Sequence, residues 1–237
     1  MLLSVIVPVF NEEKTIIQLL NKIYKQKKKL NIEVIVSDDG STDKTVFFLK
    51  KNKYLFDYLH ISSKNFGKGH AIKAVVKKAR GDIILIQDAD LEYDPDDYKK
   101  LITPILKNES NCVYGSRVLG RKKYFNGKNF NEQFRIFANF FLTFLSNLLN
   151  RQNLTDAHTC YKLIRKKIFK KINLSHNDFS FCSEVNTKLS LLGEKIIEVP
   201  IKYSGRTVYE GKKIRFKDAF IALFTIIKFR FLKFVKF

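Results

Sequence analysis

Residues 82–92, DIILIQDADLE, join an uninterrupted apolar run to three carboxylates. A continuous apolar run predicts a strand buried on both faces, which is typical of a parallel sheet. Residues 2–9 (LLSVIVPV) and 32–37 (IEVIVS) have the same character, and polar residues follow each of them. The chain therefore indicates a buried sheet that places polar side chains at the ends of its strands.

Helical patterns separate these strands, and strands that alternate with helices predict βαβ units and a largely parallel sheet. Such sheets bind ligands beyond the carboxyl ends of their strands, so the polar residues at these ends should meet. We expect helices over residues 12–28, after 41–43, over 67–78 and from 95 to about 106, and further strands over 54–61 and 112–115.

The second half of the chain has a different character. Residues 134–149 are apolar almost all round, which is short for a membrane span and fits a buried or interfacial helix. We expect a helix over 182–192, a strand over 194–201 and a basic loop over 205–215. Residues 216–237 predict a basic amphipathic helix, whose apolar face holds Phe216, Phe220, Leu223, Phe224, Ile227, Phe231, Phe234 and Val235.

Composition limits the classes of protein. With 237 residues and 45% hydrophobic content, the chain can bury a sizeable core, which excludes a disordered tail or a disulfide-stapled miniprotein. Its net charge of +21 favours an anionic partner, although a general abundance of lysine also contributes to that charge. Isolated Cys112, Cys160 and Cys182 fit a reducing cytosol. Neither a signal peptide nor a membrane span is expected.

The carboxylates after residues 82–87 are the strongest chemical signal. In an extended chain, Asp88, Asp90 and Glu92 point to the same side. A cation relieves their mutual repulsion, and oxygen ligands suit Mg²⁺ or Mn²⁺. An acidic turn is the alternative, because Asp and Glu are common after strands. The position at the expected ligand edge favours the metal site.

A second acidic segment, Asp38-Asp39-Gly40-Ser41-Thr42-Asp43, follows the strand over residues 32–37. A carboxylate at a strand end can accept a hydrogen bond from a ribose hydroxyl or a base N–H. Ser and Asp also suit the first turn of a helix. We expect binding from Asp38 or Asp39, and helix capping from Ser41 and Asp43.

Gly67-Lys68-Gly69 precedes another expected helix. Its glycines would let the backbone approach a phosphate at the helix N-terminus, and Lys68 would add charge. The chain contains neither GxGxxG nor GxxxxGK[ST], which excludes a dinucleotide fingerprint and a P-loop.

Basic residues accumulate in the second half, where Arg suits bidentate binding of phosphate. Asp156, within residues 155–162 (TDAHTCYK), is either a catalytic carboxylate or a loop residue. His158 and Cys160 in the same segment are expected to be structural. The basic candidates are Arg117, Arg135, Arg206, Lys212 and Lys213.

Together these segments resemble family 2 glycosyltransferases of the GT-A fold, and especially dolichol-phosphate mannosyltransferases and bacterial polyprenyl-phosphate glycosyltransferases. The resemblance covers roughly residues 3–230 in order. It rests on VIVPVFNEE, VSDDGSTDKT, NFGKGHAI, ARGDIILIQDADLEYDP, YGSRV, LTDAHTCYKLIRK, EVPIKYSGR and EGKKIRFKDAF.

The resemblance implies an α/β fold, in which a Rossmann-like, mostly parallel sheet is flanked by helices and followed by C-terminal amphipathic helices. It implies a single glycosyltransferase domain over residues 1–215. Residues 1–110 would be its nucleotide-sugar-binding half and residues 111–215 its acceptor half. Residues 216–237 would form the basic, aromatic C-terminal helix.

The resemblance also assigns roles to single residues. Asp90, Asp156 and Arg117 would be catalytic. Asp88, Asp90 and Glu92 would bind Mg²⁺ or Mn²⁺. The nucleotide would contact Pro8, Phe10, Glu12, Asp38, Asp39, Lys68 and Asp88. Phosphates, including that of the acceptor, would contact Arg117, Arg135, Arg206 and Lys213.

Three features depart from the family pattern. Phe10 replaces a common Tyr, which keeps stacking but loses a hydroxyl group. Glu92 replaces a Gln found in some members, and a carboxylate can still bind a metal ion. The transmembrane tail of several relatives is missing, which argues against membrane integration but not against membrane contact.

The implied reaction moves a hexose, with inversion, from a nucleotide sugar of the GDP-mannose or UDP-glucose type to a polyprenyl or dolichyl phosphate. A phosphate acceptor needs no strong base, because the second pKa of a phosphate monoester is about 6. A hydroxyl acceptor would need a general base, for which Asp156 is the candidate. The role of Asp156 therefore bears on the identity of the acceptor.

The expected location is the cytoplasm, peripheral at the inner face of the cell membrane, because the basic, aromatic helix over residues 216–237 suits an anionic lipid surface. Packing of its apolar face on the protein's own core or on a partner is the alternative. Nucleic acid is not expected as a partner. One alternative is a family 2 enzyme that acts on a hydroxyl group in cell-envelope polysaccharide or glycolipid. Another is a metal-dependent nucleotidyltransferase, although its basic, glycine-rich loop is missing. A basic membrane- or nucleic-acid-binding module is the non-enzymatic alternative.

Overall fold

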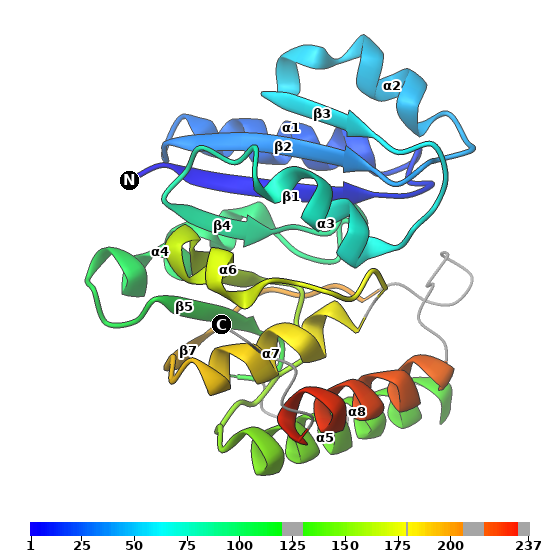
Figure 1. The fold of residues 1–237 in the computed structure, drawn as a ribbon. Helices are drawn as coiled ribbons and strands as arrows, with labels where there is room; N and C mark the ends of the chain where they lie inside the picture. The colour runs from blue at the N-terminus through cyan, green and yellow to red at the C-terminus, as the bar shows by residue number, and fades with distance from the viewer. Residues whose placement is uncertain (120–129, 179, 206–215, 232–237) are drawn as a thin grey trace.

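A computed structural model describes residues 1–119, 130–178, 180–205 and 216–231, and it describes only the backbone at 130–132, 134, 135 and 216–220. In this part of the chain seven strands form one sheet in the order β3-β2-β1-β4-β6-β5-β7 (Figure 1). The strands are β1 (Leu3–Val9), β2 (Ile32–Asp38), β3 (Tyr58–Ile61), β4 (Ile83–Ile86), β5 (Cys112–Ser116), β6 (Lys162–Arg165) and β7 (Ile196–Pro200).

The sheet is mostly parallel. β1 pairs in parallel with β2 and β4, β2 with β3, and β5 with β7. β6 runs antiparallel to both of its neighbours, β4 and β5. The carboxyl ends of the other strands consequently lie at one edge of the sheet, as the sequence predicts.

Helices cover both faces of the sheet, with α3, α6 and α7 on one face and α1 and α4 on the other (Figure 1). This arrangement confirms the expected α/β fold class. The helices are α1 (Ile16–Lys27), α2 (Thr45–Lys51), α3 (Lys68–Val76), α4 (Tyr98–Leu106), α5 (Phe130–Asn150), α6 (Lys166–Ile172), α7 (Phe181–Leu191) and α8 (Phe216–Phe231). Single 3₁₀ turns occur at Lys53–Leu55 and Pro95–Asp97.

The core lies between the sheet and these helices. Every residue of β1, β2 and β4 is buried, which explains their continuous apolar sequences. Ile6 in β1 is opposite Ile35 of β2 and Ile86 of β4. The central strands therefore form a rigid support for the loops that follow them.

A second layer is built from three helices. α8 packs against α7 and α5, and α5 also contacts α7 (Figure 1). Tyr114 of β5 donates a hydrogen bond of 2.7 Å to Asn186 of α7, which joins this layer to the sheet. The layer thus extends the second half of the fold beyond the sheet.

Several boundaries differ from expectation. Strand β6 and helix α6 were not predicted, because a four-residue strand followed by a lysine-rich heptad shows neither periodicity clearly. α1 begins at Ile16 rather than at residue 12, since the residues before it form a turn. α5 extends over 21 residues, beyond the expected 134–149.

The central position of Ile6 leads to a stability prediction. Ile6→Ala leaves a cavity in the core that covers the central strands and should lower the free energy of unfolding by about 2–5 kcal/mol, measured by urea denaturation. Ile61→Ala is the matched control, because Ile61 is 41% exposed on the edge strand β3 and should lose about 0.5 kcal/mol or less. Equal losses in the two variants would contradict this account of the core.

Candidate active site

The loops that follow β1 and β2 are joined to each other by side-chain hydrogen bonds. The backbone N–H of Asn11 donates to Ser41 Oγ at 2.9 Å, and the N–H of Thr42 donates to Asn11 Oδ1 at 2.8 Å. Ser41 was expected to cap a helix, and that prediction is wrong because its hydroxyl instead holds the β1 loop. Asp43 does accept from the N–H of Thr45, the first residue of α2, at 2.9 Å.

The paired carboxylates at the end of β2 are buried and hold loops in place. Asp38 Oδ1 accepts from the N–H groups of Gly40 and Ser41, whereas Asp38 Oδ2 is buried without a hydrogen-bond partner among the described residues. Asp39 accepts from the N–H groups of Phe66 and Gly67, the latter at 2.6 Å. Asp39 therefore connects the β2 loop to the amino end of α3.

Other residues expected to contact a nucleotide lie close to these loops. Pro8 is buried near the end of β1, and Phe10 is half-buried immediately after it. Glu12 is buried, and its carboxylate accepts from the Thr15 hydroxyl at 2.9 Å. These residues thus surround the carboxyl ends of β1 and β2.

Lys68 and Asp88 form an ion pair between the amino end of α3 and the end of β4. Lys68 Nζ lies 2.5 Å from Asp88 Oδ1, and the lysine side chain is only 12% exposed. Burial opposes the charge of Lys68, but the neighbouring Asp88 carboxylate raises the pKa of Lys68 well above its ordinary value. The structure thus brings together two residues that the sequence placed in separate motifs.

The segment after Asp88 is not extended. Ala89 and Asp90 form a turn, and Leu91 has a φ of 63°, so the predicted alignment of Asp88, Asp90 and Glu92 on one side is wrong. Asp90 Oδ1 accepts from the N–H of Glu92 at 3.2 Å. The Glu92 carboxylate accepts from the Tyr203 hydroxyl at 2.7 Å, although it was expected to bind a metal ion.

Asp88 and Asp90 remain the side chains best suited to hold a divalent cation. Both are partly exposed at the end of β4. Within the described residues, no group of three His, Cys, Asp or Glu side chains is arranged to hold an ion by itself. Two carboxylates fit a Mg²⁺ or Mn²⁺ ion that takes its other ligands from the phosphates of a substrate.

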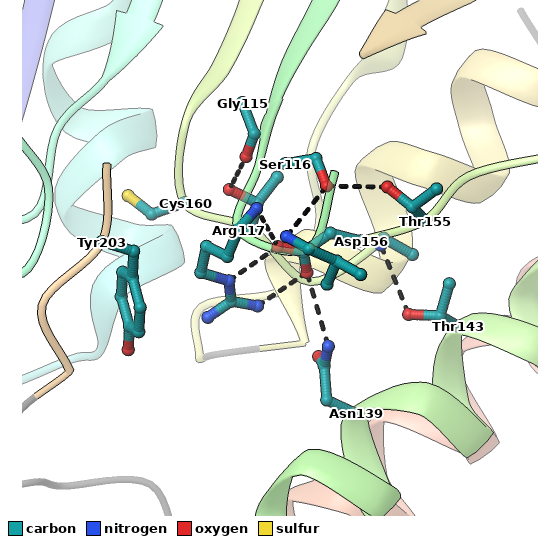
Figure 2. Close-up of polar contacts among 12 residues, drawn as sticks. Gly115, Ser116, Arg117, Asn139, Thr143, Thr155, Asp156, Cys160 and Tyr203 are labelled. Atoms are coloured by element: carbon teal, nitrogen blue, oxygen red, sulfur yellow. Dashed lines mark hydrogen bonds and ion pairs between the residues drawn. The ribbon is translucent and has the colours of Figure 1, made fainter. Parts of the chain in front are cut away.

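Arg117 and Asp156 form the second charged pair of the site, directly after β5 (Figure 2). Arg117 Nε and Nη2 donate to the two Asp156 oxygens, each at 2.7 Å, and the Arg117 N–H donates to Oδ2 at 3.0 Å. Asn139 of α5 approaches Asp156 Oδ1 at 3.5 Å. Burial opposes the charge of Asp156, but Arg117 lowers its pKa below the usual range.

The loop that carries Asp156 is itself fixed by another carboxylate. Glu198 of β7 accepts from the N–H of Thr155 at 2.7 Å and from the N–H of Asp156 at 2.9 Å. The Thr155 and Ser116 hydroxyl groups lie 2.7 Å apart, which ties the same loop to the end of β5. Asp156 is consequently held on all sides and is completely buried.

Three residues of this site, Glu198, Tyr203 and Lys162, were not predicted from the sequence. The guanidinium carbon of Arg117 lies over the Tyr203 ring, 5.2 Å from the ring centroid. The Tyr203 hydroxyl donates a hydrogen bond to Glu92. Buried Lys162 donates to the carbonyl of Ala157 at 2.8 Å, and burial lowers its pKa to about 8. Glu198 lies in β7 and Tyr203 just after it. Their position near the carboxyl end of a predicted strand was the signal that could have placed them in the site.

The remaining predicted residues are His158 and four basic residues of the second half of the chain. His158 was expected to be structural. Burial, and to a smaller extent the positive charge of neighbouring Lys162, lowers the pKa of His158 to about 4, so the imidazole is neutral at pH 7. Arg135 belongs to α5, but its side chain lies outside the described residues. Arg206, Lys212 and Lys213 lie outside them altogether.

The family described as "Glycosyl transferase family 2" matches residues 4–173, which include both charged pairs and the β1, β2 and β4 loops. The chain belongs to glycosyl transferase family 2. It is therefore a glycosyltransferase, and the sheet edge described above is the candidate active site of that enzyme.

Relatives within this glycosyltransferase family include proteins of archaea. An uncharacterized protein of Methanocaldococcus jannaschii is 34% identical, over 90% of this chain and 89% of its own. A dolichol-phosphate mannosyltransferase of Pyrococcus furiosus is 28% identical over 90% of this chain, which spans 59% of that relative. A UDP-N-acetylglucosamine–dolichyl-phosphate N-acetylglucosaminyltransferase of Methanococcus voltae is 29% identical over 85% of both chains.

Solved structures confirm the fold of this glycosyltransferase. Glucosyl-3-phosphoglycerate synthase of Mycobacterium tuberculosis superposes with a TM-score of 0.70 at 18% identity, over 96% of this chain and 76% of that one. That enzyme was crystallised with Mn²⁺ and UDP, and in another crystal with Mg²⁺ and UDP. The likeness confirms the expected GT-A-type fold.

The buried Arg117–Asp156 pair leads to a second prediction. Asp156→Asn leaves the guanidinium without its counter-charge, so the free energy of unfolding at pH 7 should fall by about 3–5 kcal/mol. The double variant with Arg117→Met should lose much less than the sum of the two single variants, because each single change already breaks the pair. Additive losses in urea denaturation would contradict the pairing.

The stability lost in Asp156→Asn should depend on pH. The pKa of Asp156 is lower in the folded protein than in the unfolded chain, where it is about 3.9. Its contribution to stability is therefore complete above the unfolded pKa and is lost as the pH falls through the folded pKa. The difference in stability between the wild type and Asp156→Asn should be constant from pH 6 to 8 and shrink below about pH 4.

Proposed function

We propose that this glycosyltransferase moves a hexose from a nucleotide sugar, of the GDP-mannose or UDP-glucose type, to a polyprenyl or dolichyl phosphate with inversion at the anomeric carbon. One observation carries the choice of acceptor. A hydroxyl acceptor would need Asp156 as its base. Asp156 is completely buried, and both of its carboxylate oxygens accept hydrogen bonds from Arg117.

Because the Asp156 carboxylate already accepts hydrogen bonds from Arg117, the site favours an acceptor that is ionised without a general base. The pKa of Asp156 is lowered by Arg117, so Asp156 is a weak base at pH 7. A phosphate monoester has its second pKa near about 6 and needs no base to become a nucleophile. Arg117, oriented by Asp156, offers a guanidinium suited to phosphate oxygens. In this proposal Asp156 is a positioning residue for Arg117.

The donor side is supported by the ends of β1, β2 and β4. Phe10 and the Asp38–Asp39 loop would receive the base and ribose, and Lys68 would approach the diphosphate. The relatives from Pyrococcus furiosus and Methanococcus voltae are named for transfer to dolichyl phosphate, one of them from a UDP-sugar. Both names fit the proposed acceptor and leave the donor base open between guanine and uracil.

The reaction is a single displacement. A lone pair of the acceptor phosphate attacks the anomeric carbon, and the bond from that carbon to the diphosphate oxygen breaks. Asp88 and Asp90 would hold a Mg²⁺ or Mn²⁺ ion, which when bound neutralises charge on the departing nucleoside diphosphate. The ammonium of Lys68, fixed beside Asp88, places a second positive charge near the same leaving group.

Helix α5 supports contact with a lipid surface, because its polarity is inverted relative to an ordinary helix of a globular protein. It buries Thr143, Ser146 and Asn150, the last at 1% exposure. Its exposed side chains form an aromatic stripe that consists of Phe137, Phe140, Phe141, Phe144 and Leu148. Exposed apolar patches of this kind mark interaction sites.

Helix α8 lies beside α5 and carries a similar stripe (Figure 1). It turns Ala222, Ile226 and Phe229 inward and exposes Ile221, Phe224, Ile227 and Phe231. Three of these exposed residues, Phe224, Ile227 and Phe231, belong to the apolar face that the sequence predicted for this helix. We define the α5–α8 aromatic face as the exposed residues of the two stripes.

A lipid surface is the occupant that this face fits best. Lys228 and Arg230 lie among the exposed aromatic residues of α8, and the chain has a net charge of +21, which suits anionic headgroups. In the described part of the chain, no helix is long and apolar enough to cross a membrane. Peripheral docking at the cytoplasmic face would bring the site to a lipid-linked phosphate.

The activity is tested with a panel of UDP- and GDP-sugars, a short polyprenyl phosphate and Mn²⁺ or Mg²⁺. We expect glycolipid and released nucleoside diphosphate by mass spectrometry with one donor, and no product when the metal is chelated. Asp90→Asn should lower turnover at least about a hundredfold. Glu109→Gln, a carboxylate-to-amide change at an exposed site, should have no effect.

The same assay distinguishes the alternatives. Nucleotide-sugar binding without transfer to the lipid phosphate would exclude the proposed acceptor and favour a hydroxyl group instead. Failure to bind any nucleotide sugar would exclude the proposed donor.

Membrane docking is tested by sedimentation with vesicles of phosphatidylglycerol and phosphatidylcholine. Phe144→Glu combined with Phe224→Glu should weaken vesicle binding at least about tenfold, because a buried Phe contributes roughly 1.5–3 kcal/mol. Phe47→Glu combined with Tyr54→Glu is the matched control, since these aromatic side chains are equally exposed near the other end of the sheet. Equal binding of the two double variants would argue against docking through the α5–α8 aromatic face.

A further inference from the structure

Residues 173–178, between α6 and α7, lie against the amino end of α3. The N–H of His70 donates to the carbonyl of Asn177 at 3.0 Å. Lys73 Nζ donates to the carbonyl of Ser175 at 2.9 Å and to Asn177 Oδ1 at 2.5 Å. Three hydrogen bonds thus join this segment to the helix that begins with Lys68.

The contact between the two backbones is close enough to require glycine. A Cβ atom at Gly69 would lie 2.5 Å from the carbonyl oxygen of His176, and one at Gly67 would collide with the carbonyl oxygen of Asn177. Gly67 also has a φ of 106°, which other residues rarely adopt. The position of segment 173–178 is therefore coupled directly to that of the Gly67-Lys68-Gly69 backbone.

A buried carboxylate of α7 holds the other side of this segment. Glu184 accepts from the N–H and hydroxyl of Ser175 at 2.7 and 2.8 Å, and from the N–H of His176 at 2.9 Å. Lys188 lies 2.6 Å from Glu184 and also donates to the carbonyl of Asn173 at 2.7 Å. Because Glu184 and Lys188 are buried, this attachment is firm.

Helix α8 touches the same segment through Phe229. The ring of His176 packs edge-on against Phe229 with centroids 5.4 Å apart. The ammonium of Lys188 lies 4.7 Å from the same ring centroid. Phe229 is on the buried side of α8, opposite the aromatic side chains that the helix exposes. A continuous series of contacts therefore runs from α8 through segment 173–178 to α3.

We propose that segment 173–178 is a positioning element of the donor site, and that it couples donor binding at Lys68 to docking of α8. The inference rests on the proposed function, which places the diphosphate near Lys68 and a lipid surface on α8. Glu184 and Lys73 fix the segment, and His176 connects it to α8. Docking and donor binding favour the same position of the segment, so each strengthens the other by the same factor.

The positioning role is tested with Lys73→Met. Lys73 lies at the protein surface and makes its hydrogen bonds to the segment from α3, so the variant should fold normally. The Kd for UDP or GDP with Mn²⁺, measured by calorimetry, should rise about fivefold or more. Lys77→Met, the same change on an exposed residue at the end of α3, is the control and should leave the Kd unchanged. An unaltered Kd in Lys73→Met would overturn the positioning role.

The coupling is tested by repeating the titrations on the phosphatidylglycerol and phosphatidylcholine vesicles. For the wild type, vesicles should lower the nucleotide Kd by about fivefold or more, and the nucleotide should strengthen vesicle binding equally. His176→Ala should abolish this linkage, and His176→Phe, which keeps a ring against Phe229, should restore it. His60→Ala on β3 is the control and should retain the linkage.

The outcomes separate this inference from the function on which it rests. A protein that binds both nucleotide and vesicles, but with a Kd that vesicles do not change, overturns the coupling and leaves the proposed function intact. A protein that binds no nucleotide or no vesicles overturns the corresponding part of the proposed function, and the coupling with it.

Discussion

Burying a carboxylate is costly unless its oxygens accept hydrogen bonds or face a positive charge, and this cost shapes the loops of the site. Asp39 holds the amino end of α3, Asp156 holds Arg117, and Glu184 holds segment 173–178. Asp39 and Asp156 accept from backbone N–H groups of loops that are distant in sequence, and Glu184 accepts from those of the segment that precedes its own helix. The site is therefore assembled by the satisfaction of buried negative charge, within a chain whose total charge is strongly positive.

The two halves of the molecule differ in which side chains they bury. The central strands and the helices on their faces bury a continuous apolar core, and the residues predicted to bind the donor follow those strands. The α5, α7 and α8 layer instead buries polar side chains of α5 and exposes aromatic ones. Exposing aromatic side chains to water is unfavourable, and under the proposed function a lipid surface would cover this stripe.

Much of the donor side could be predicted from sequence, because strands β1, β2 and β4 are continuous apolar runs and the residues after them are polar. Asp88 and Lys68 were assigned to the donor site from separate motifs, and the structure places them in contact. The turn after Asp88 was not predictable from strand geometry, since it depends on the positive φ of Leu91. Nor was the diversion of Glu92 to Tyr203, a partner 111 residues away.

The sequence by itself determined the parallel sheet, the edge at which polar residues gather and the family to which the enzyme belongs, because these follow from local periodicity and short motifs. Only the tertiary structure decided which partner each charged residue contacts. Asp156 becomes the support of Arg117 because β5 and the loop before β6 lie side by side, although 39 residues separate the pair. Likewise, the exposed face of α5 follows from how α7 and α8 pack against it. Neighbours of this kind depend on the folding of distant segments, which no local pattern records.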